Sequence, residues 1–307
     1  MREKRECIYY SEYFRDQILK SFLATILNQG TETNYKNNIR MLCNYLQMDF
    51  LEITEEDANR YMQHLYSLYY KGELSRRTSN VRLSTYKTLS SYIEATYPEL
   101  GFSNPFSNIK STLFDANVPI THVPSMKDVD LLMSAAKDDE MYYLILALAG
   151  RAALTAGNIV RINRNNMLVD EDGTVMLTFP PSNNFKEPFS VIMPSDVSSL
   201  LISYINTHES PDGSGYIFFN RNQKPLRVYN IDMKFQKILK KSGVSEKYTI
   251  KDLRTRAIID MKKNGVSTQD ISAYTNLSAY RVGKFSRAAS FSKMCPADLV
   301  NYKLKEE

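Results

Sequence analysis

The chain has 307 residues, of which 43% are hydrophobic and 24% are charged, and its 39 Lys and Arg against 34 Asp and Glu give a net charge of +5. This length predicts two domains, each with its own core, and the ordinary composition excludes a disordered or fibrous protein. A small positive charge permits a polyanionic partner without requiring one, so the positions of the basic residues decide the question.

Cysteine and histidine usage argues against several kinds of site. Cys7, Cys43 and Cys295 lie far apart and are odd in number, which predicts neither a disulfide framework nor a metal site. The three histidines are also too far apart for local metal-ligand spacing. The charged N-terminus has no apolar signal sequence, and the longest apolar run is too short to cross a bilayer. We therefore expect a cytoplasmic protein without a metal and without a membrane partner.

The first hundred residues predict helices separated by polar turns. Apolar residues recur at helical spacing over residues 12–27 and again over residues 33–46. Thr54-Glu-Glu-Asp57 is typical of a capping box, with acidic residues at the positive end of a helix over residues 58–70. A fourth helix is expected over residues 75–96. This segment therefore predicts an all-helical N-terminal domain.

Three prolines mark the end of this domain. They stand at positions 98, 105 and 119, among polar residues, and they interrupt helical continuity. We place the boundary near Asn117. The expected organisation is a helical DNA-binding domain over residues 1–112, a linker over residues 113–124 and a second domain over residues 125–307.

The second domain begins with another capping box, Ser125-Met-Lys-Asp128, followed by apolar helical segments. Residues 173–179 and 189–193 have the composition of strands, and the proline-bounded turn between them predicts an antiparallel pair. Helices are expected again from Val197 onward. The predicted fold class is therefore mainly α, with a helical N-terminal domain and an α-rich second domain that carries a small antiparallel β-sheet.

Basic residues gather in two segments. Residues 75–87 combine arginines with hydroxyl and amide side chains, which avoid the apolar positions Val81, Leu83 and Leu89 of the same helix. Residues 251–287 carry eight basic residues against three acidic ones. Such side chains are the usual donors to DNA phosphates and bases. An ordinary solvated helix surface explains the first segment nearly as well. The expected DNA-binding residues are Arg76, Arg77, Thr78, Asn80, Arg82 and Lys87 in the first segment, and Arg256, Arg281, Lys284 and Arg287 in the second.

Several motifs together resemble the tyrosine recombinase, or phage integrase, family. Residues 75–87 resemble its core-binding helix, and Asn104-Pro-Phe106 resembles the motif that leads into its linker. Lys186, between the two expected strands, matches the family's β-hairpin lysine, a general acid for the leaving 5′ hydroxyl. Lys251-Asp-Leu-Arg254 matches the family's His/Lys-x-x-Arg box. The resemblance implies a core-binding (SAM-like) domain and a recombinase catalytic-type domain that clamp duplex DNA, with no cofactor.

Three positions depart from the family's catalytic pattern. The arginine of its Thr-Gly-Leu-Arg turn falls on Thr155, the histidine of its Gly-His motif falls on Leu277, and its nucleophilic tyrosine falls on Ser286. A serine lacks the acidity of a phenol, and no histidine follows position 208 to deprotonate it. The retained cations Lys186, Lys251 and Arg254 are expected to bind a phosphate without cutting the DNA. We therefore expect no enzymatic activity.

These observations predict a sequence-specific protein that binds double-stranded DNA. By resemblance to integrase-fold prophage repressors, we expect a transcriptional regulator of a prophage or mobile element, associated with the nucleoid and of bacterial or phage origin. Self-association is expected through the C-terminal tail, where Leu299, Val300 and Leu304 share one side of an amphipathic helix. A regulatory protein or peptide is a further expected partner.

Three alternatives stay open. In the first, the chain is a divergent recombinase that uses Tyr274, Tyr280 or Tyr302 as its nucleophile, or an accessory subunit of an active recombinase. In the second, residues 267–284 form a helix-turn-helix with Asn276 in the turn, which also places this region on DNA. In the third, the chain is a helical scaffold for a protein partner, which a lack of salt-dependent DNA binding would favour.

Overall fold

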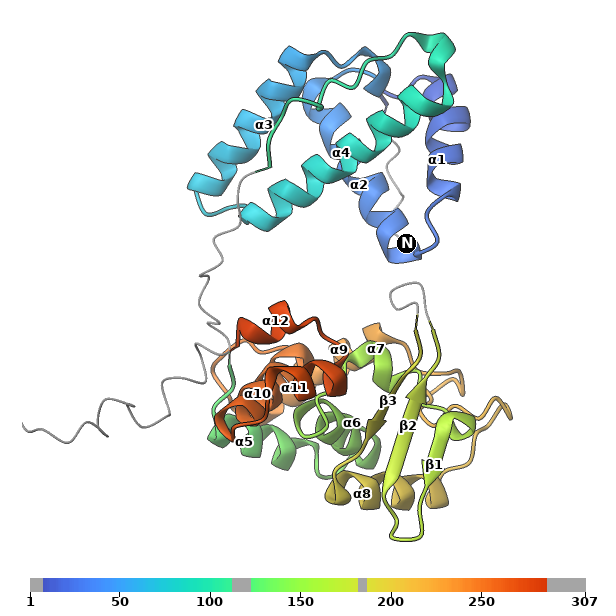
Figure 1. Cartoon of the computed structure of the whole chain (residues 1–307), viewed down its shortest axis with the longest axis vertical. Coiled ribbons are helices and arrows are strands. Elements are labelled where there is room, and N and C mark those ends of the chain that lie inside the picture. The colour runs from blue at the N-terminus through green and yellow to red at the C-terminus, as the bar shows by residue number, and fades with distance from the viewer. Residues whose placement is uncertain (1–7, 112–122, 182–186, 286–307) are drawn as a thin grey trace, which may run out of the picture. The chain divides into compact units, whose positions relative to one another are not determined.

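The computed structural model describes residues 8–111, 123–181 and 187–285 (Figure 1). The chain divides into two compact units, Met1–Val118 and Pro119–Glu307. The boundary expected at Asn117 and most of the expected linker lie outside the described residues. Within these residues the chain is mainly helical and carries one small antiparallel sheet, which confirms the predicted fold class.

Helices are the regular elements of the described part of unit 1. The helix expected to begin at residue 33 begins earlier, because the Asn28 side chain accepts a hydrogen bond from the Thr31 amide at 3.0 Å. The capping box at Thr54 is confirmed, since its hydroxyl accepts from the Asp57 amide at 3.2 Å and an Asp57 oxygen accepts from the Thr54 amide at 3.2 Å. The helices are η1 (Phe14–Leu19), α1 (Lys20–Ala24), α2 (Gln29–Leu46), η2 (Phe50–Glu52), α3 (Glu55–Tyr70), α4 (Arg76–Thr96) and η3 (Pro98–Leu100).

Aromatic rings fill the core of unit 1. The fully buried Phe50 stacks on Phe14 and Phe106, with ring centroids 5.5 Å and 6.2 Å apart. The Tyr86 hydroxyl lies 3.1 Å from the Asn38 carbonyl oxygen and 3.3 Å from the Tyr61 hydroxyl. A tyrosine hydroxyl is tolerated in a core when it is hydrogen-bonded, as it is here. These contacts hold α2, α3 and α4 together.

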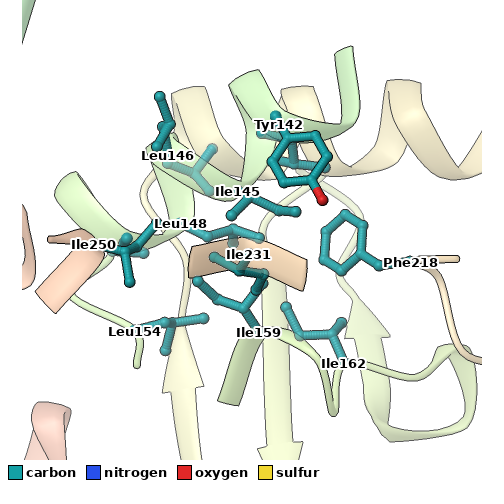
Figure 2. Packing of buried hydrophobic residues seen from close by; sticks show 14 of the residues in the cluster. Tyr142, Ile145, Leu146, Leu148, Leu154, Ile159, Ile162, Phe218, Ile231 and Ile250 are labelled. Atoms are coloured by element: carbon teal, nitrogen blue, oxygen red, sulfur yellow. The ribbon is translucent and has the colours of Figure 1, made fainter. Parts of the chain in front are cut away.

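Unit 2 is packed around an apolar helix, α6 (Glu140–Gly150), in which every side chain from Leu144 to Ala149 is buried. A helix that is apolar on all sides belongs in the centre of a domain. Figure 2 shows Ile145 and Leu148 of this helix beside Ile231 from α9. The other helices of unit 2 are α5 (Met126–Ala136), α7 (Ala156–Ile159), η4 (Arg164–Asn166), α8 (Ser195–Thr207), α9 (Val228–Ser242), α10 (Ile250–Lys263), α11 (Thr268–Thr275) and α12 (Ala279–Gly283).

Three strands form the sheet of unit 2. They are β1 (Met167–Val169), β2 (Val175–Phe179) and β3 (Phe189–Ile192), all antiparallel and in that order. The two expected strands are confirmed, whereas β1 is not predicted from the sequence because three residues are too few to show alternation. Leu177 and Val191, which are directly paired, face the core.

Candidate nucleic-acid interface

Arg254 lies half-buried on α10, and its guanidinium group joins two loops of unit 2. Nε donates to the Ala153 carbonyl oxygen at 2.7 Å, and Nη2 donates to the Thr275 carbonyl oxygen at 2.6 Å. Burial lowers the pKa of Arg254 to about 10, so the side chain stays charged at neutral pH. Nη1 makes no hydrogen bond to the described part of the chain. The guanidinium is therefore held in place while donors remain for an anion.

Lys251 lies one turn before Arg254. Asp252 and Thr249 cap this end of α10, with the Thr249 amide 2.8 Å from an Asp252 oxygen. A spacing of three residues places the exposed Lys251 on the same side of the helix as Arg254. Lys251 thus lies in the first turn of α10 and Arg254 in the second, near the helix end whose dipole also favours an anion. Lys186, the third expected phosphate-binding residue, lies outside the described residues.

Thr155 caps a short helix at the position where the resemblance places an arginine. Its hydroxyl accepts from the Asn158 amide at 3.0 Å and also makes a short hydrogen bond to the Asn158 side chain. Ala153, at the glycine position of the same motif, has a φ of 52°. This left-handed conformation costs a non-glycine residue about 1–2 kcal/mol. The turn therefore has the backbone conformation that a glycine adopts most easily, although Thr155 supplies no positive charge.

Leu277 follows the turn between α11 and α12. Asn276 in this turn has a φ of 52°, so the two helices are joined as the helix-turn-helix alternative predicts, but α12 spans five residues. The Leu277 side chain packs against the small cluster formed by Ala153, Ala257, Ile258, Ile271 and Val282. It therefore contributes packing where the resemblance places a histidine. Ser286 and Arg287 lie outside the described residues.

Two tyrosines near this turn differ in exposure. Tyr274 packs against the core, and burial raises its pKa to about 12, so it is protonated at neutral pH. Tyr280, at the start of α12, is 69% exposed, and the Lys284 Nζ lies 4.7 Å from the centre of its ring. The positive charge of Arg151 acts in the opposite direction and lowers the pKa of Tyr274. Arg151 itself forms an ion pair with Asp196 at 3.0 Å. Tyr302 lies outside the described residues.

The remaining basic residues expected in unit 2 fall into two groups. Arg281 and Lys284 are exposed on α12. Arg256, in contrast, donates to an Asp260 oxygen at 2.8 Å and to the Pro124 carbonyl oxygen at 3.2 Å. Its guanidinium is therefore largely engaged within unit 2, and its expected role on DNA stays a prediction.

α4 presents the polar residues of its first half in a different rotation from the one the sequence indicates. Asn80 is only 9% exposed, whereas Val81, expected on the apolar side, is 48% exposed. The reason is that the buried side of α4 carries small polar residues, among them Thr85, whose hydroxyl accepts a hydrogen bond from the Asn38 side chain at 2.9 Å. The expected base contact of Asn80 is therefore not accessible in this structure.

The other expected residues of α4 also make internal contacts. Arg76 donates to the Tyr69 hydroxyl at 3.1 Å and stacks over its ring. Lys87 donates to the Ser107 carbonyl oxygen at 3.0 Å. The Thr78 hydroxyl lies 2.8 Å from the Ser75 hydroxyl, and the Arg82 Nε is buried. Of the six expected residues, Arg77 is exposed, whereas the other five are buried or partly buried.

The part of the chain that the structure describes offers no group of three or more His, Cys, Asp or Glu side chains able to hold a metal ion. Across the same residues, no helix combines the length and the apolar character needed to span a membrane.

A sequence model described as the phage integrase family matches residues 125–280, just over half of the chain. The chain belongs to the phage integrase family. The matched residues include the Thr155 turn, the sheet, Lys251, Arg254 and the α11–α12 turn, so they contain the described part of the candidate site in unit 2. No curated protein matches the chain.

Solved structures of integrases and recombinases share this fold. The XerH site-specific recombinase bound to its difH substrate is 13% identical with a TM-score of 0.69, covering 90% of this chain and 82% of that one. A lambda integrase dimer bound to a COC′ core site is 15% identical with a TM-score of 0.68, covering 92% and 79%. The Tn1549 transposon integrase in complex with transposon right end DNA is 13% identical with a TM-score of 0.62, covering 89% and 98%.

These findings correct one expectation from the sequence. The residues at positions 155, 277 and 286 argue against an enzyme, but that expectation is wrong, because the chain is a member of the phage integrase family and its structural matches are integrases and recombinases. The family match extends over a whole domain, whereas the expectation depends on three single positions.

Proposed function

We propose that this phage integrase family member binds a specific double-stranded DNA site and acts there in DNA recombination. The similar structures of lambda integrase and XerH, both solved with DNA, support this proposal. The observation that carries it is the Arg254 guanidinium, which two carbonyl oxygens hold while donors remain free beside Lys251. A cation held in advance loses little side-chain entropy when it binds a phosphate oxygen.

In this proposal most of the cations position the DNA backbone. Arg254 and Lys251 bind one phosphate, and the exposed Arg281 and Lys284 of α12 contact neighbouring phosphates. Arg77 on α4 adds a contact from unit 1. These contacts give affinity that falls as salt rises, because each phosphate that is neutralised releases counterions.

Tyr280 is the proposed nucleophile for strand cleavage. Its phenol gives up its proton to water and its oxygen attacks the phosphorus. The bond from phosphorus to the 5′ oxygen breaks, and the leaving oxygen takes a proton from Lys186. The product is a covalent 3′ phosphotyrosyl link. The exposure of Tyr280 and the positive charge of Lys284 beside its ring support this role.

DNA selection followed by a test for a covalent adduct examines both parts of the proposal. The full chain is used to select duplexes from a random library, and the best duplex is then prepared as a nicked suicide substrate. We expect specific, salt-sensitive binding and a protein–DNA adduct on a denaturing gel that Tyr280→Phe abolishes. An adduct that persists in Tyr280→Phe assigns the nucleophile to another tyrosine, and no adduct at saturating protein contradicts cleavage.

A transcriptional regulator of a prophage or mobile element is the second candidate. Thr155 caps α7 and Leu277 packs in a core cluster, so neither residue adds charge at a scissile phosphate, while the cations that bind DNA remain. A protein that occupies a promoter site blocks transcription whether or not it also cuts. Repression of a reporter carrying the selected site, equal for wild type and Tyr280→Phe, is the expected result. An unrepressed reporter contradicts this role.

Self-association on DNA is also part of the proposal. Lambda integrase has been solved as a dimer on a core site and as a tetramer on a Holliday junction. We expect this chain to form a dimer or larger assembly on its selected duplex, measurable by light scattering. A complex that contains one chain at saturation contradicts this expectation. Its expected tail contact and a regulatory protein or peptide partner stay predictions.

A further inference from the structure

The sheet of unit 2 has one face against the core and one face toward solvent. Val175 and Leu177 of the central strand point inward and are buried. The residues between and beside them point to the opposite face, because side chains alternate along a strand. The antiparallel register aligns three of these residues, Leu168, Met176 and Ile192, side by side on β1, β2 and β3. We call these three residues the outer row.

The outer row is apolar and open to solvent. Leu168 is 63% exposed and Ile192 is 60% exposed, while Met176 between them is partly buried. Single exposed apolar residues are common on protein surfaces, but three in register across a whole sheet form a continuous strip. The next pair on the same face, Thr178 and Ser190, is polar, and the two hydroxyl oxygens lie 2.9 Å apart. The outer row is therefore a narrow apolar strip with polar residues beside it, as in a small protein–protein interface.

The two ends of the sheet differ in charge. The turn between β1 and β2, at the lower end of the sheet in Figure 1, carries three exposed carboxylates in succession at positions 170–172. None of them forms an ion pair with a described residue. At the other end of β2, the Arg161 guanidinium donates to the Pro180 carbonyl oxygen at 2.7 Å. Glu187 lies at that end too, two residues before β3. One end of the sheet is therefore strongly acidic, whereas the other carries charges of both signs.

A second copy of this chain fits this strip. The strip is self-complementary when a two-fold axis runs along it and turns the second copy over, so that each residue of the outer row meets its own counterpart. Because this axis crosses the strands, the acidic turn of each copy lies at the end of the other sheet that carries Arg161. An axis along the strands would instead bring the two acidic turns together, and repulsion between like charges disfavours it. Charge therefore selects one arrangement of the two copies.

The size of the face limits how strongly two free copies associate. Three strands about 4.8 Å apart, each with about four residues at roughly 3.4 Å per residue, give a face only about 14 Å on a side. A stable dimer interface is larger and buries roughly 800 Å² on each partner. The contact is thus weak between free chains, and it becomes effective when two copies are held on one duplex at a high effective concentration.

We infer that the outer row is a self-association surface on which a second copy of this chain packs, sheet against sheet. This inference rests on the self-association that is part of the proposed function, and it assigns a surface to it. The contact lies within the described part of unit 2 and is separate from the tail contact expected from the sequence. Two copies on neighbouring DNA sites bind cooperatively, because the contact removes Leu168 and Ile192 from water.

Cross-linking at the centre of the strip tests the contact in the absence of DNA. Facing sheets lie about 10 Å apart, too far for a disulfide, so a short bismaleimide is applied to Met176→Cys in the full chain. The background is Cys7→Ser/Cys295→Ser, while the buried Cys43 is kept. Ser199→Cys, at an exposed position of α8, is the matched control. We expect a cross-linked dimer from Met176→Cys at high protein concentration, and about tenfold less from the control. Equal yields, or no dimer from Met176→Cys, overturn the inference.

A charge exchange at Ile192 tests which axis relates the copies. Ile192→Lys and Ile192→Glu each place like charges opposite one another in the inferred arrangement, so each should lower the dimer yield from Met176→Cys about tenfold. A mixture of the two variants should restore the yield, because opposite charges then face each other. Leu200→Lys, at an exposed apolar position of α8, should leave the yield unchanged. A mixture that stays as low as the single variants overturns this arrangement. Circular dichroism verifies that each variant folds.

DNA binding separates this inference from the proposed function. On a duplex with two copies of the selected site, we expect wild type to bind cooperatively. Ile192→Lys should lose this cooperativity, and Leu200→Lys, which adds the same charge, should keep it. If wild type binds no DNA but still cross-links through position 176, the proposed function fails and the inference stands. If wild type binds both sites independently and gives no cross-link, the inference fails and the proposed DNA binding stands.

Discussion

At the scale of single residues, Arg254 serves the fold and the proposed DNA contact together. Two of its nitrogens satisfy carbonyl oxygens from loops that lie far apart in the sequence. Both loops have a residue in the left-handed conformation, Ala153 and Asn276. Hydrogen bonds from a charged donor hold such strained turns more strongly than neutral ones do. A variant at this position is therefore expected to change stability as well as affinity.

Arg254→Ala should lower the free energy of unfolding by about 2–4 kcal/mol, because two carbonyl oxygens lose a charged donor. Arg254→Lys keeps the charge but lacks the planar group that reaches both oxygens, so a smaller loss is expected. Urea denaturation followed by circular dichroism measures both values. A loss below about 1 kcal/mol in Arg254→Ala would mean that water replaces the guanidinium at these oxygens.

Two buried phenols predict how stability depends on alkaline pH. Burial raises the pKa of Tyr204 and of Tyr274 from 10.0 to about 12. The unfolded chain therefore releases these protons at a lower pH than the folded chain does. Their contribution to stability is complete below pH 10.0 and is lost as the pH rises toward 12.

The measurement for this prediction is the urea midpoint of wild type, Tyr204→Phe and Tyr274→Phe between about pH 9 and pH 11. The urea midpoint of each Phe variant should fall less steeply with rising pH than that of wild type. The reason is that the variant lacks one phenol whose pKa differs between the folded and the unfolded chain. If the urea midpoint declines equally steeply in wild type and both variants, the alkaline sensitivity belongs to other groups, such as Tyr86, whose pKa burial also raises.

At the scale of elements, the helix ends offer a direct test of backbone conformation. Gln47, at the C-terminal end of α2, is exposed and has a φ of 58°, a conformation that glycine adopts more easily. Gln47→Gly should stabilise the protein by about 0.5–1 kcal/mol. Gly243, with a φ of 73° at the end of α9, is the matched position in unit 2. Gly243→Ala should destabilise it by a similar amount, and thermal melting of both variants measures the opposite shifts.

The chemistry of helix ends also explains how much of the fold the sequence predicts. Caps at Thr54 and Ser125 depend on residues three positions apart, so the sequence identifies both capping boxes correctly, although α3 begins at Glu55 and not at residue 58 as expected. Which side of α4 faces the core depends instead on the side chains of α2 that pack against it. Because Asn38 binds Thr85 across 47 positions, the polar side of α4 turns inward and Val81 turns out. Hydrophobic periodicity does not detect such a contact.

The candidate site is predictable only in part for the same reason. The Lys251-Asp-Leu-Arg254 motif is local, and helical spacing alone places its two cations on one side of α10. Whether a basic residue is free for DNA depends on distant partners, as Lys234 and Asp139 show across 95 positions.

At the scale of the whole molecule, the buried clusters divide in the same way as the two units. Every residue of the aromatic cluster around Phe50 belongs to unit 1, and the cluster around α6 belongs to unit 2. A cluster of buried apolar residues that is complete within one segment favours independent folding of that segment.

We therefore expect fragments 1–118 and 119–307 each to unfold in a single cooperative transition when expressed alone. Calorimetry of each fragment, compared with the full chain, measures this. Agreement between calorimetric and van't Hoff enthalpies supports independent folding. A fragment that shows a broad transition without cooperativity would mean that its core depends on the other segment.

The division into two aromatic-containing cores also has a spectroscopic consequence. The chain has no tryptophan, so its intrinsic emission comes from tyrosine alone. Phe102 is partly buried against Phe50 in unit 1, and Phe189 is partly buried against Phe179 in unit 2. Phe102→Trp and Phe189→Trp would each introduce a single tryptophan, which can be excited at a wavelength that tyrosine does not absorb. The tryptophan emission of each variant would then report the unfolding of one unit within the intact protein.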